Sequence, residues 1–235
     1  MRLAMWSGPR NLSTAMMYAF ANRDDFAAVD EPFYAAYLAA TGLEHPMRAE
    51  ILAAQPQDPE DVVAQLTGPI PDGKPHFYQK HMAQHMLPGV PTDWMEDVVN
   101  VFLIRHPARV IASYGEKREN PTLDDIGFWQ QAELHAKFGG VVIDSHDIRE
   151  NPEGMLRALC DEIGLEFDPA MVSWPAGGRA CDGVWAPHWY GAVWQSTGFA
   201  GKEGPLPEVP EHLRGVMTAA LSYYERLKTE AISAR

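Results

Sequence analysis

The chain has 235 residues, of which 46% are hydrophobic and 22% are charged, and its formal net charge is −13. This length and composition predict a single α/β domain over residues 1–235. The acidic balance excludes a general affinity for nucleic acid or for an anionic membrane. The two cysteines lack metal-ligand spacing, which argues against a disulfide framework and a structural metal. Because no apolar run approaches a membrane span, we expect a soluble, cytoplasmic protein.

Taken in chain order, short apolar runs predict five strands, and longer periodic segments predict the helices between them. The predicted strands are Leu3–Trp6, Ala27 to Pro32, His76–Met82, 98–104 and Val141–Asp144. The predicted helices are Ser13–Arg23, short helices within 34–66, Thr122–Phe138, a helix with Asn151 as N-cap and Gly164 as its stop, and about Pro210 to Lys228. Residues 172–204 show no period and predict a long functional loop. The alternation predicts a three-layer α/β, P-loop-like fold with a mostly parallel five-stranded sheet flanked by helices.

The segment SGPRNLST joins the first strand to the first helix. At such a turn the first helical amides lack internal partners and the helix dipole favours an anion. Gly8 would allow close backbone approach, Arg10 offers a charged fork, and Ser13 and Thr14 offer hydroxyl and amide donors. The glycine-lysine pair of the NTPase P-loop is absent, which disfavours an ordinary ATPase. The alternative is that Ser13 only caps the helix and Arg10 lies in solvent.

The segment RHPARVIASY begins just beyond the fourth predicted strand. Arg105 therefore lies at the carboxyl end of the sheet, the edge at which open parallel sheets bind ligands. If a helix follows, Arg105 and Ser113 would converge on a second anion, across the crevice from the first. The alternative is a strand-terminal arginine that pairs with one of the many acids, which contributes under about 1 kcal/mol when exposed.

Together these segments resemble the sulfotransferases that use 3'-phosphoadenosine 5'-phosphosulfate (PAPS). SGPRNLST is similar to their 5'-phosphosulfate loop, which places Gly8, Pro9, Arg10, Asn11, Ser13 and Thr14 as cofactor-binding residues. RHPARVIAS is similar to their 3'-phosphate motif, R-x-P-x-x-x-x-x-S, and this places the arginine and serine at Arg105 and Ser113. VVIDSHDIRENPEGMLRALCDEIGLEFD resembles their fifth strand and the helix that follows it. GRACDGVW resembles a late 3'-phosphate loop, with Arg179 at the lysine position, although Gly178 and Ala180 depart from the pattern.

The resemblance offers two kinds of general base. Glu31, in the sequence DEPF, matches a glutamate that takes the acceptor proton in bacterial and carbohydrate-type members. His81 or His85, in KHMAQH, would replace it as in phenol-type members, although both are out of register with that motif. We favour Glu31 as the base. The alternative is that Glu31 is a cap or pairs with a structural arginine.

The resemblance implies PAPS as donor, adenosine 3',5'-bisphosphate as product, and a small-molecule or glycan acceptor. Transfer of a loose sulfuryl group requires in-line positioning and positive donors rather than a bound metal, so no metal is expected. Lys80 would add a second charge beside Arg10, or would be an ordinary surface cation. Five aromatic residues would wall an acceptor pocket, or would pack a long loop against the core: Trp185, Trp189, Tyr190, Trp194 and Phe199.

Two other functional hypotheses stay open. One is a P-loop kinase-like phosphotransferase, and the other is a nucleotide-binding protein that keeps the fold without the transfer. The wording WSGPRNLSTAMMYAF also resembles a branch labelled as aminotransferase-like. A pyridoxal phosphate enzyme of that type would need a longer chain and a convincing Schiff-base lysine.

Overall fold

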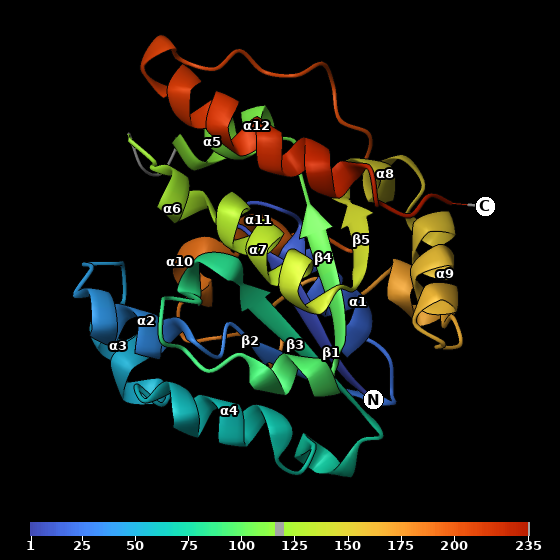
Figure 1. The fold of residues 1–235 in the computed structure, drawn as a ribbon. Coiled ribbons are helices and arrows are strands. Elements are labelled where there is room, and N and C mark those ends of the chain that lie inside the picture. Colours follow the sequence, from blue (N-terminus) through green and yellow to red (C-terminus); the bar gives the residue numbers. More distant parts are fainter. Residues whose placement is uncertain (116–119, 235) are drawn as a thin grey trace.

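A computed structural model describes residues 1–115 and 120–234 of the chain. Its five strands form one sheet in the order β2-β3-β1-β4-β5, and every neighbouring pair is parallel (Figure 1). The α/β class with a five-stranded parallel sheet is therefore confirmed. The strands are β1 Arg2–Ser7, β2 Phe26–Asp30, β3 His76–Met82, β4 Val99–Ile104 and β5 Val141–Asp144.

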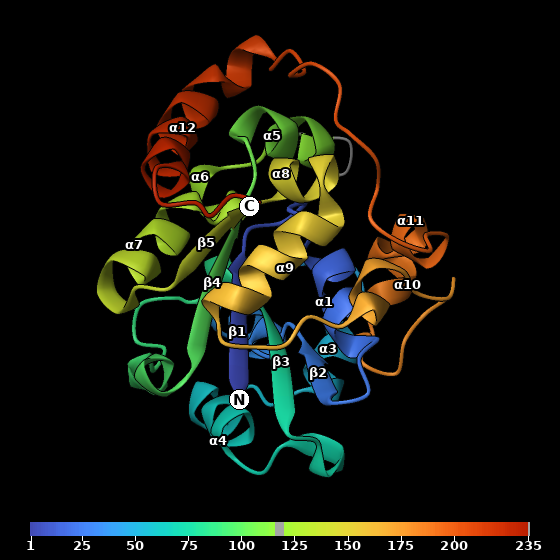
Figure 2. The ribbon, with the colours of Figure 1, turned by 90° about the vertical axis from the view of Figure 1, so that its right-hand side faces the viewer.

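Helices cover both faces of this sheet, as Figure 2 shows from the side. One face carries α1 and α9, and the other carries α4, α7 and α12. The helices are α1 Ser13–Ala21, α2 Tyr34–Thr41, α3 Arg48–Ala54, α4 Pro59–Thr67, α5 Pro107–Gly115, α6 Leu123–Ile126, α7 Phe128–Phe138, α8 Ser145–Glu150, α9 Pro152–Glu162, α10 Ala186–Trp189, α11 Gly191–Trp194 and α12 Arg214–Lys228. Within residues 1–115 and 120–234, no helix has the length and apolar character needed to cross a membrane.

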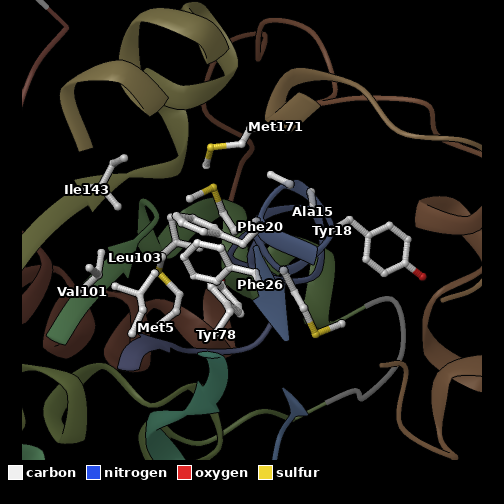
Figure 3. Packing of buried hydrophobic residues seen from close by; sticks show 14 of the residues in the cluster. Met5, Ala15, Tyr18, Phe20, Phe26, Tyr78, Val101, Leu103, Ile143 and Met171 are labelled. Carbon is white, nitrogen blue, oxygen red and sulfur yellow. The ribbon is translucent and has the colours of Figure 1, made fainter. Parts of the chain in front are cut away.

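The larger core lies between the sheet and α1. Met5 of β1 and Leu103 of β4 project toward Phe20 of α1, whose ring stacks on Tyr78 with centroids 4.8 Å apart (Figure 3). All four side chains are fully buried. The strands read as nearly continuous apolar runs because both faces of the sheet are covered.

Two helix predictions need correction, and one is confirmed in detail. The predicted helix Thr122–Phe138 is two helices, α6 and α7, because Gly127 between them adopts a left-handed backbone with φ 72°. The short helix α8, directly after β5, was not predicted. The predicted cap of α9 is correct, since the Asn151 side chain accepts a hydrogen bond from the Gly154 amide.

The sheet order places β1 between β3 and β4, so its carboxyl end adjoins both neighbours. In register, Ser7 at the end of β1 lies beside Met82 of β3 and Leu103 of β4. The loop that follows Ser7 therefore emerges between β1 and β4, whose onward connections lie on opposite faces of the sheet, through α1 after β1 and through α7 after β4. Open parallel sheets bind their ligands in the crevice at such a point.

Gly8 has a packing role that the sequence did not suggest. A β-carbon built at Gly8 would lie 2.3 Å from the carbonyl oxygen of Ile126. We therefore expect Gly8→Ala to lower the free energy of unfolding by about 1–3 kcal/mol, because the α6 terminus must move away. Urea denaturation would measure this loss. Gly215→Ala is the matched control, since a β-carbon there meets nothing within 4 Å, and an equal loss in both variants would contradict the explanation.

Candidate functional site

A cavity of about 270 Å³ opens at the carboxyl ends of the central strands. Its lining comes from the loop after β1 and the first turn of α1, from residues at the ends of β2, β3 and β4, and from the end of α5. Aromatic residues of α2 and of the segment around α10 complete the wall. Ten of the predicted catalytic and cofactor-binding residues line this cavity: Pro9, Arg10, Asn11, Ser13, Thr14, Glu31, Lys80, His85, Arg105 and Ser113. Gly8, His81 and Arg179 do not line it.

The loop after β1 has an unusual backbone. Arg10 and Leu12 both adopt left-handed conformations, with φ of 63° and 71°. Each such non-glycine residue costs about 1–3 kcal/mol, and strain of this kind gathers at functional sites. Leu12 is the N-cap of α1 and caps no amide with its side chain, so Ser13 does not act as the cap. The opening turn of α1 thus presents its amides to the cavity.

The two basic segments identified in the sequence are in direct contact. Arg10 Nε donates a hydrogen bond to Ser113 Oγ at 2.9 Å, and Arg105 Nη1 donates to the Arg10 carbonyl at 2.6 Å. Asn11 Nδ2 bonds the Leu103 carbonyl, which anchors the loop to β4. Arg10 and Arg105 therefore line the same cavity. Arg105 directly follows β4, as predicted.

Glu31 lies immediately after β2, also in a left-handed backbone conformation, with φ 40°. Its carboxylate accepts a hydrogen bond from Lys80 Nζ at 2.6 Å, and Asp30 accepts another at 2.8 Å. Burial raises the pKa of Glu31 above its ordinary value, and the charge of Lys80 opposes that shift. The result is a buried carboxylate at the cavity wall, held by an ion pair.

Lys80 is not a surface cation, because its side chain is only 1% exposed. Its third contact is with the Tyr190 hydroxyl at 2.8 Å, and that hydroxyl donates in turn to Asp30 Oδ2 at 2.7 Å. Burial acts against the charged form of Lys80, but Asp30 and Glu31 outweigh it and raise its pKa well above the ordinary value. Sequence patterns had not indicated Asp30, although it directly precedes Glu31.

The two candidate histidines occupy different places. His81 stacks on Trp6 with centroids 4.3 Å apart, in the core on the far face of the sheet, and burial lowers its pKa to about 3. His85 lines the cavity, where its ring stacks between Tyr34 and Tyr37. Burial also lowers the pKa of His85 well below the usual value, so both rings are neutral at pH 7.

The late loop holding Arg179 lies against α1 and outside the cavity that Arg105 lines. The Arg179 guanidinium sits over the Tyr18 ring, 5.4 Å from its centroid, and the Gly183 amide bonds Asp30. Of the five aromatic residues proposed as a pocket wall, Trp185, Trp189 and Tyr190 line the cavity. The other two do not: Trp194 bonds Asp182 and Phe199 packs on Trp174.

A cluster missed in the sequence adjoins Arg105. The Glu203 carboxylate pairs with Arg105, Arg109 and Arg149. Arg105 directly follows β4 and Arg109 lies in the first turn of α5. Their separation of four residues is the one signal of this cluster in the sequence. Across residues 1–115 and 120–234, no group of three or more His, Cys, Asp or Glu is arranged to hold a metal ion.

The fold and the motifs of this site agree with a family match. Residues 1–231 match the family model described as "Sulfotransferase domain", so the chain belongs to the sulfotransferase domain family. Two curated proteins of Arabidopsis thaliana are similar to it: "Branched-chain-amino-acid aminotransferase-like protein 2", 36% identical over 200 residues, and "protein 1" of that name, 38% identical over 203 residues. Each alignment covers 83% of this chain but only 35% and 36% of those proteins, so the chain spans about a third of their length.

Three solved structures share the fold. The "Sulfotransferase Domain from the Synechococcus PCC 7002 Olefin Synthase" aligns with TM-score 0.54 and 16% identity, over 96% of this chain and 94% of that one. The "Sulfotransferase Domain from the Curacin Biosynthetic Pathway" aligns with TM-score 0.54 and 16% identity, over 94% and 97%. A sulfotransferase from Alicyclobacillus acidocaldarius aligns with TM-score 0.55 and 12% identity, over 98% and 96%.

Proposed function

We propose that this chain transfers a sulfuryl group from PAPS to a hydroxyl or amine of a small-molecule or glycan acceptor. The observation that carries the proposal is one cavity that joins the open turn of α1, the Arg10–Arg105 pair and the buried Glu31 carboxylate. These are an anion site and a proton acceptor within reach of one ligand. When bound, PAPS supplies the activated sulfuryl group, and the residues below position it and accept the proton.

The opening turn of α1 suits the phosphosulfate end of the donor. Its first amides have no partner inside the helix, and the helix dipole adds positive potential there. Arg10, Ser13 and Thr14 line the same part of the cavity and add a guanidinium and two hydroxyls. These groups stabilise negative charge on the oxygens of the sulfonate and of the leaving phosphate.

Arg105 and Ser113 are proposed to bind the 3'-phosphate of the nucleotide. Both line the cavity, and Arg10 connects them by its carbonyl and its Nε. Arg105 can offer its planar fork to a phosphate, which a lysine cannot. Arg179 lies outside the cavity, so we assign it no contact with the donor.

Glu31 is proposed as the general base that takes the proton of the acceptor. Its carboxylate lines the cavity, and burial brings its pKa closer to neutrality than that of an exposed glutamate. Lys80 already donates to Asp30, Glu31 and Tyr190, which uses all three of its N–H groups. We therefore assign Lys80 to holding Glu31 in place rather than to gripping the sulfonate.

The names of the Arabidopsis relatives include an aminotransferase, an activity that we do not extend to this chain. A Schiff base with pyridoxal phosphate requires a neutral lysine amine. Lys80, the lysine at this cavity, is held charged between two carboxylates, and its pKa is raised. The chain also covers only about a third of those relatives.

Calorimetry separates the proposed function from a kinase-like phosphotransferase. We expect adenosine 3',5'-bisphosphate to bind at least about tenfold more tightly than ATP with Mg²⁺, a difference of about 1.4 kcal/mol. Tighter binding of ATP with Mg²⁺ would favour phosphoryl transfer. A sulfuryl-transfer assay with PAPS and a panel of phenols, alcohols and sugars then tests catalysis. Nucleotide binding without transfer to any acceptor would favour a non-catalytic binding protein.

A further inference from the structure

Glu203 is a buried acid in an irregular segment between α11 and α12. Its side chain is 1% exposed. Oε1 lies 2.5 Å from Arg105 Nη2 and 2.8 Å from Arg149 Nη1, and Oε2 lies 2.8 Å from Arg109 Nε. Three arginines from α5, α8 and the end of β4 thus surround one carboxylate of the chain itself.

The positive charge of this cluster exceeds what one carboxylate neutralises. Arginine stays charged at any pH that a folded protein tolerates, so three positive charges face one negative charge. His146 Nδ1, 3.7 Å from Glu203 Oε2, adds a fourth when it is protonated. A phosphate monoester carries about −1.5 to −2 charges at pH 7 and three acceptor oxygens, so it matches three guanidiniums better than Glu203 does.

Arg105 belongs to this cluster and to the cavity at once. Its Nη1 bonds the Arg10 carbonyl at the cavity wall, while its Nη2 holds Glu203. The Glu203 carboxylate therefore occupies one arm of the guanidinium fork that the proposed function assigns to the 3'-phosphate. With Glu203 in place, the Nη2 N–H that bonds its carboxylate is not available to a second anion.

The segment that carries Glu203 is attached in a way that permits release. We define the strap as residues 200–206, which run past the α5 and α8 end of the molecule (Figures 1 and 2). Arg149 Nε bonds the Gly201 carbonyl at 2.7 Å, Arg109 bonds the Gly204 carbonyl, and Lys202 pairs with Glu150 at 2.7 Å.

Little apolar packing opposes movement of the strap. A β-carbon at Gly201 or Gly204 would meet nothing within 4 Å, and Leu206 is 52% exposed. Its attachments are thus polar and charged contacts, which water and a phosphate can replace. Glu203 would regain full hydration in solvent, and this hydration offsets part of the free energy lost with its ion pairs.

We propose that Glu203 is a built-in competitor of the donor's 3'-phosphate, a role that rests on the proposed function. Without nucleotide, the strap is closed and Glu203 occupies the Arg105, Arg109 and Arg149 cluster. A dianionic 3'-phosphate displaces the carboxylate, and the strap then moves away from the arginine cluster. The apparent affinity for the nucleotide is then lowered by the fraction of molecules with the strap closed.

Calorimetry on Glu203→Gln tests this competition. Because the amide is a neutral and weaker ligand for three arginines, we expect adenosine 3',5'-bisphosphate to bind at least about tenfold more tightly than to the unaltered chain. Binding of adenosine 5'-phosphate, which lacks the 3'-phosphate, should change less than about twofold. Glu208→Gln is the matched control: Glu208 is exposed in the segment after the strap, and its variant should resemble the unaltered chain.

Two outcomes separate failure of the competitor from failure of the function. The first outcome is that the unaltered chain prefers the bisphosphate, but folded Glu203→Gln binds it no more tightly than the unaltered chain does. In that case Glu203 only stabilises the structure, and the proposal that it competes with the 3'-phosphate is wrong. If no variant binds the bisphosphate more tightly than adenosine 5'-phosphate, the 3'-phosphate assignment itself is wrong. Thermal unfolding verifies that each variant is folded.

A second readout needs no variant. Lys202 is exposed in the strap, and trypsin cleaves after it. We expect saturating adenosine 3',5'-bisphosphate to accelerate this cleavage in the unaltered chain, and adenosine 5'-phosphate to have no such effect. Unchanged or slower cleavage with the bisphosphate bound would overturn displacement of the strap.

If Glu203→Gln fails to fold, Glu203→Asp replaces it in the calorimetry. Aspartate keeps the negative charge but has a shorter side chain, so we expect an affinity for the bisphosphate between those expected for the unaltered chain and for Glu203→Gln.

Discussion

Replacing Glu31 with glutamine is expected to reduce turnover by about 10²- to 10⁴-fold, the usual contribution of a general base. The affinity for adenosine 3',5'-bisphosphate should stay within about threefold, because the proposed contact of Glu31 is with the acceptor and glutamine keeps the shape of the side chain. Steady-state kinetics and calorimetry measure the two quantities. In the unaltered chain, activity should rise with pH as Glu31 loses its proton, at a pH above that of an ordinary glutamate.

Asp30→Asn is the matched control for this variant. Asp30 also accepts a hydrogen bond from Lys80, but it does not line the cavity. If Glu31→Gln acted only by unbalancing Lys80, Asp30→Asn would reduce turnover equally, which would contradict a role for Glu31 as base. Full activity of Glu31→Gln would transfer the role to His85, since His85 lines the cavity and His81 does not.

Replacing Arg105 with alanine is expected to weaken binding of adenosine 3',5'-bisphosphate by about 10- to 150-fold, since a hydrogen bond to a charged group contributes about 1.5–3 kcal/mol. Binding of adenosine 5'-phosphate should weaken by less than about threefold. Glu203 keeps Arg109 and Arg149 as partners in this variant, so no buried carboxylate is left unpaired. Calorimetry with both nucleotides gives the comparison.

Arg105→Lys and Arg157→Ala serve as controls for that experiment. Lysine keeps the charge but not the planar fork, so an intermediate loss is expected. Arg157 is exposed and pairs with Glu153 on α9, outside the cavity, so its loss should leave both affinities unchanged. Equal losses for the two nucleotides in Arg105→Ala would remove the 3'-phosphate assignment.

Local patterns were sufficient for the strands and for several helix ends. The bounds of β3 agree with the predicted strand His76–Met82, and Asn151 caps α9 as expected. These features depend on residues close in sequence, namely apolar runs and side chains that bond nearby amides. Gly127 shows the limit of such patterns: the helical period continues across it, and only its left-handed backbone divides α6 from α7.

The neighbouring residues Lys80 and His81 show what local patterns do not decide about the site. Side chains alternate between the faces of a strand, so Lys80 reaches the cavity while His81 packs on Trp6 beyond the sheet. The KHMAQH segment is equally consistent with either assignment until the cavity is known to lie on one face. The burial of Lys80 between Asp30 and Glu31 depends in the same way on pairing between β2 and β3.

By itself, the sequence determined the parallel α/β fold, the basic loop before α1 and the position of Arg105 at a strand end. The fold class follows from the alternation of strands and helices along the chain, and the other two follow from the order of residues within one strand, turn or helix. Only the tertiary structure decided that Arg10 and Arg105 touch, and that Glu203 closes on an arginine 98 positions away. Such contacts join segments remote in the chain, and charge attraction alone, in a chain with 32 acids and 19 bases, selects no particular partner. Packing of the sheet and its connections makes that selection.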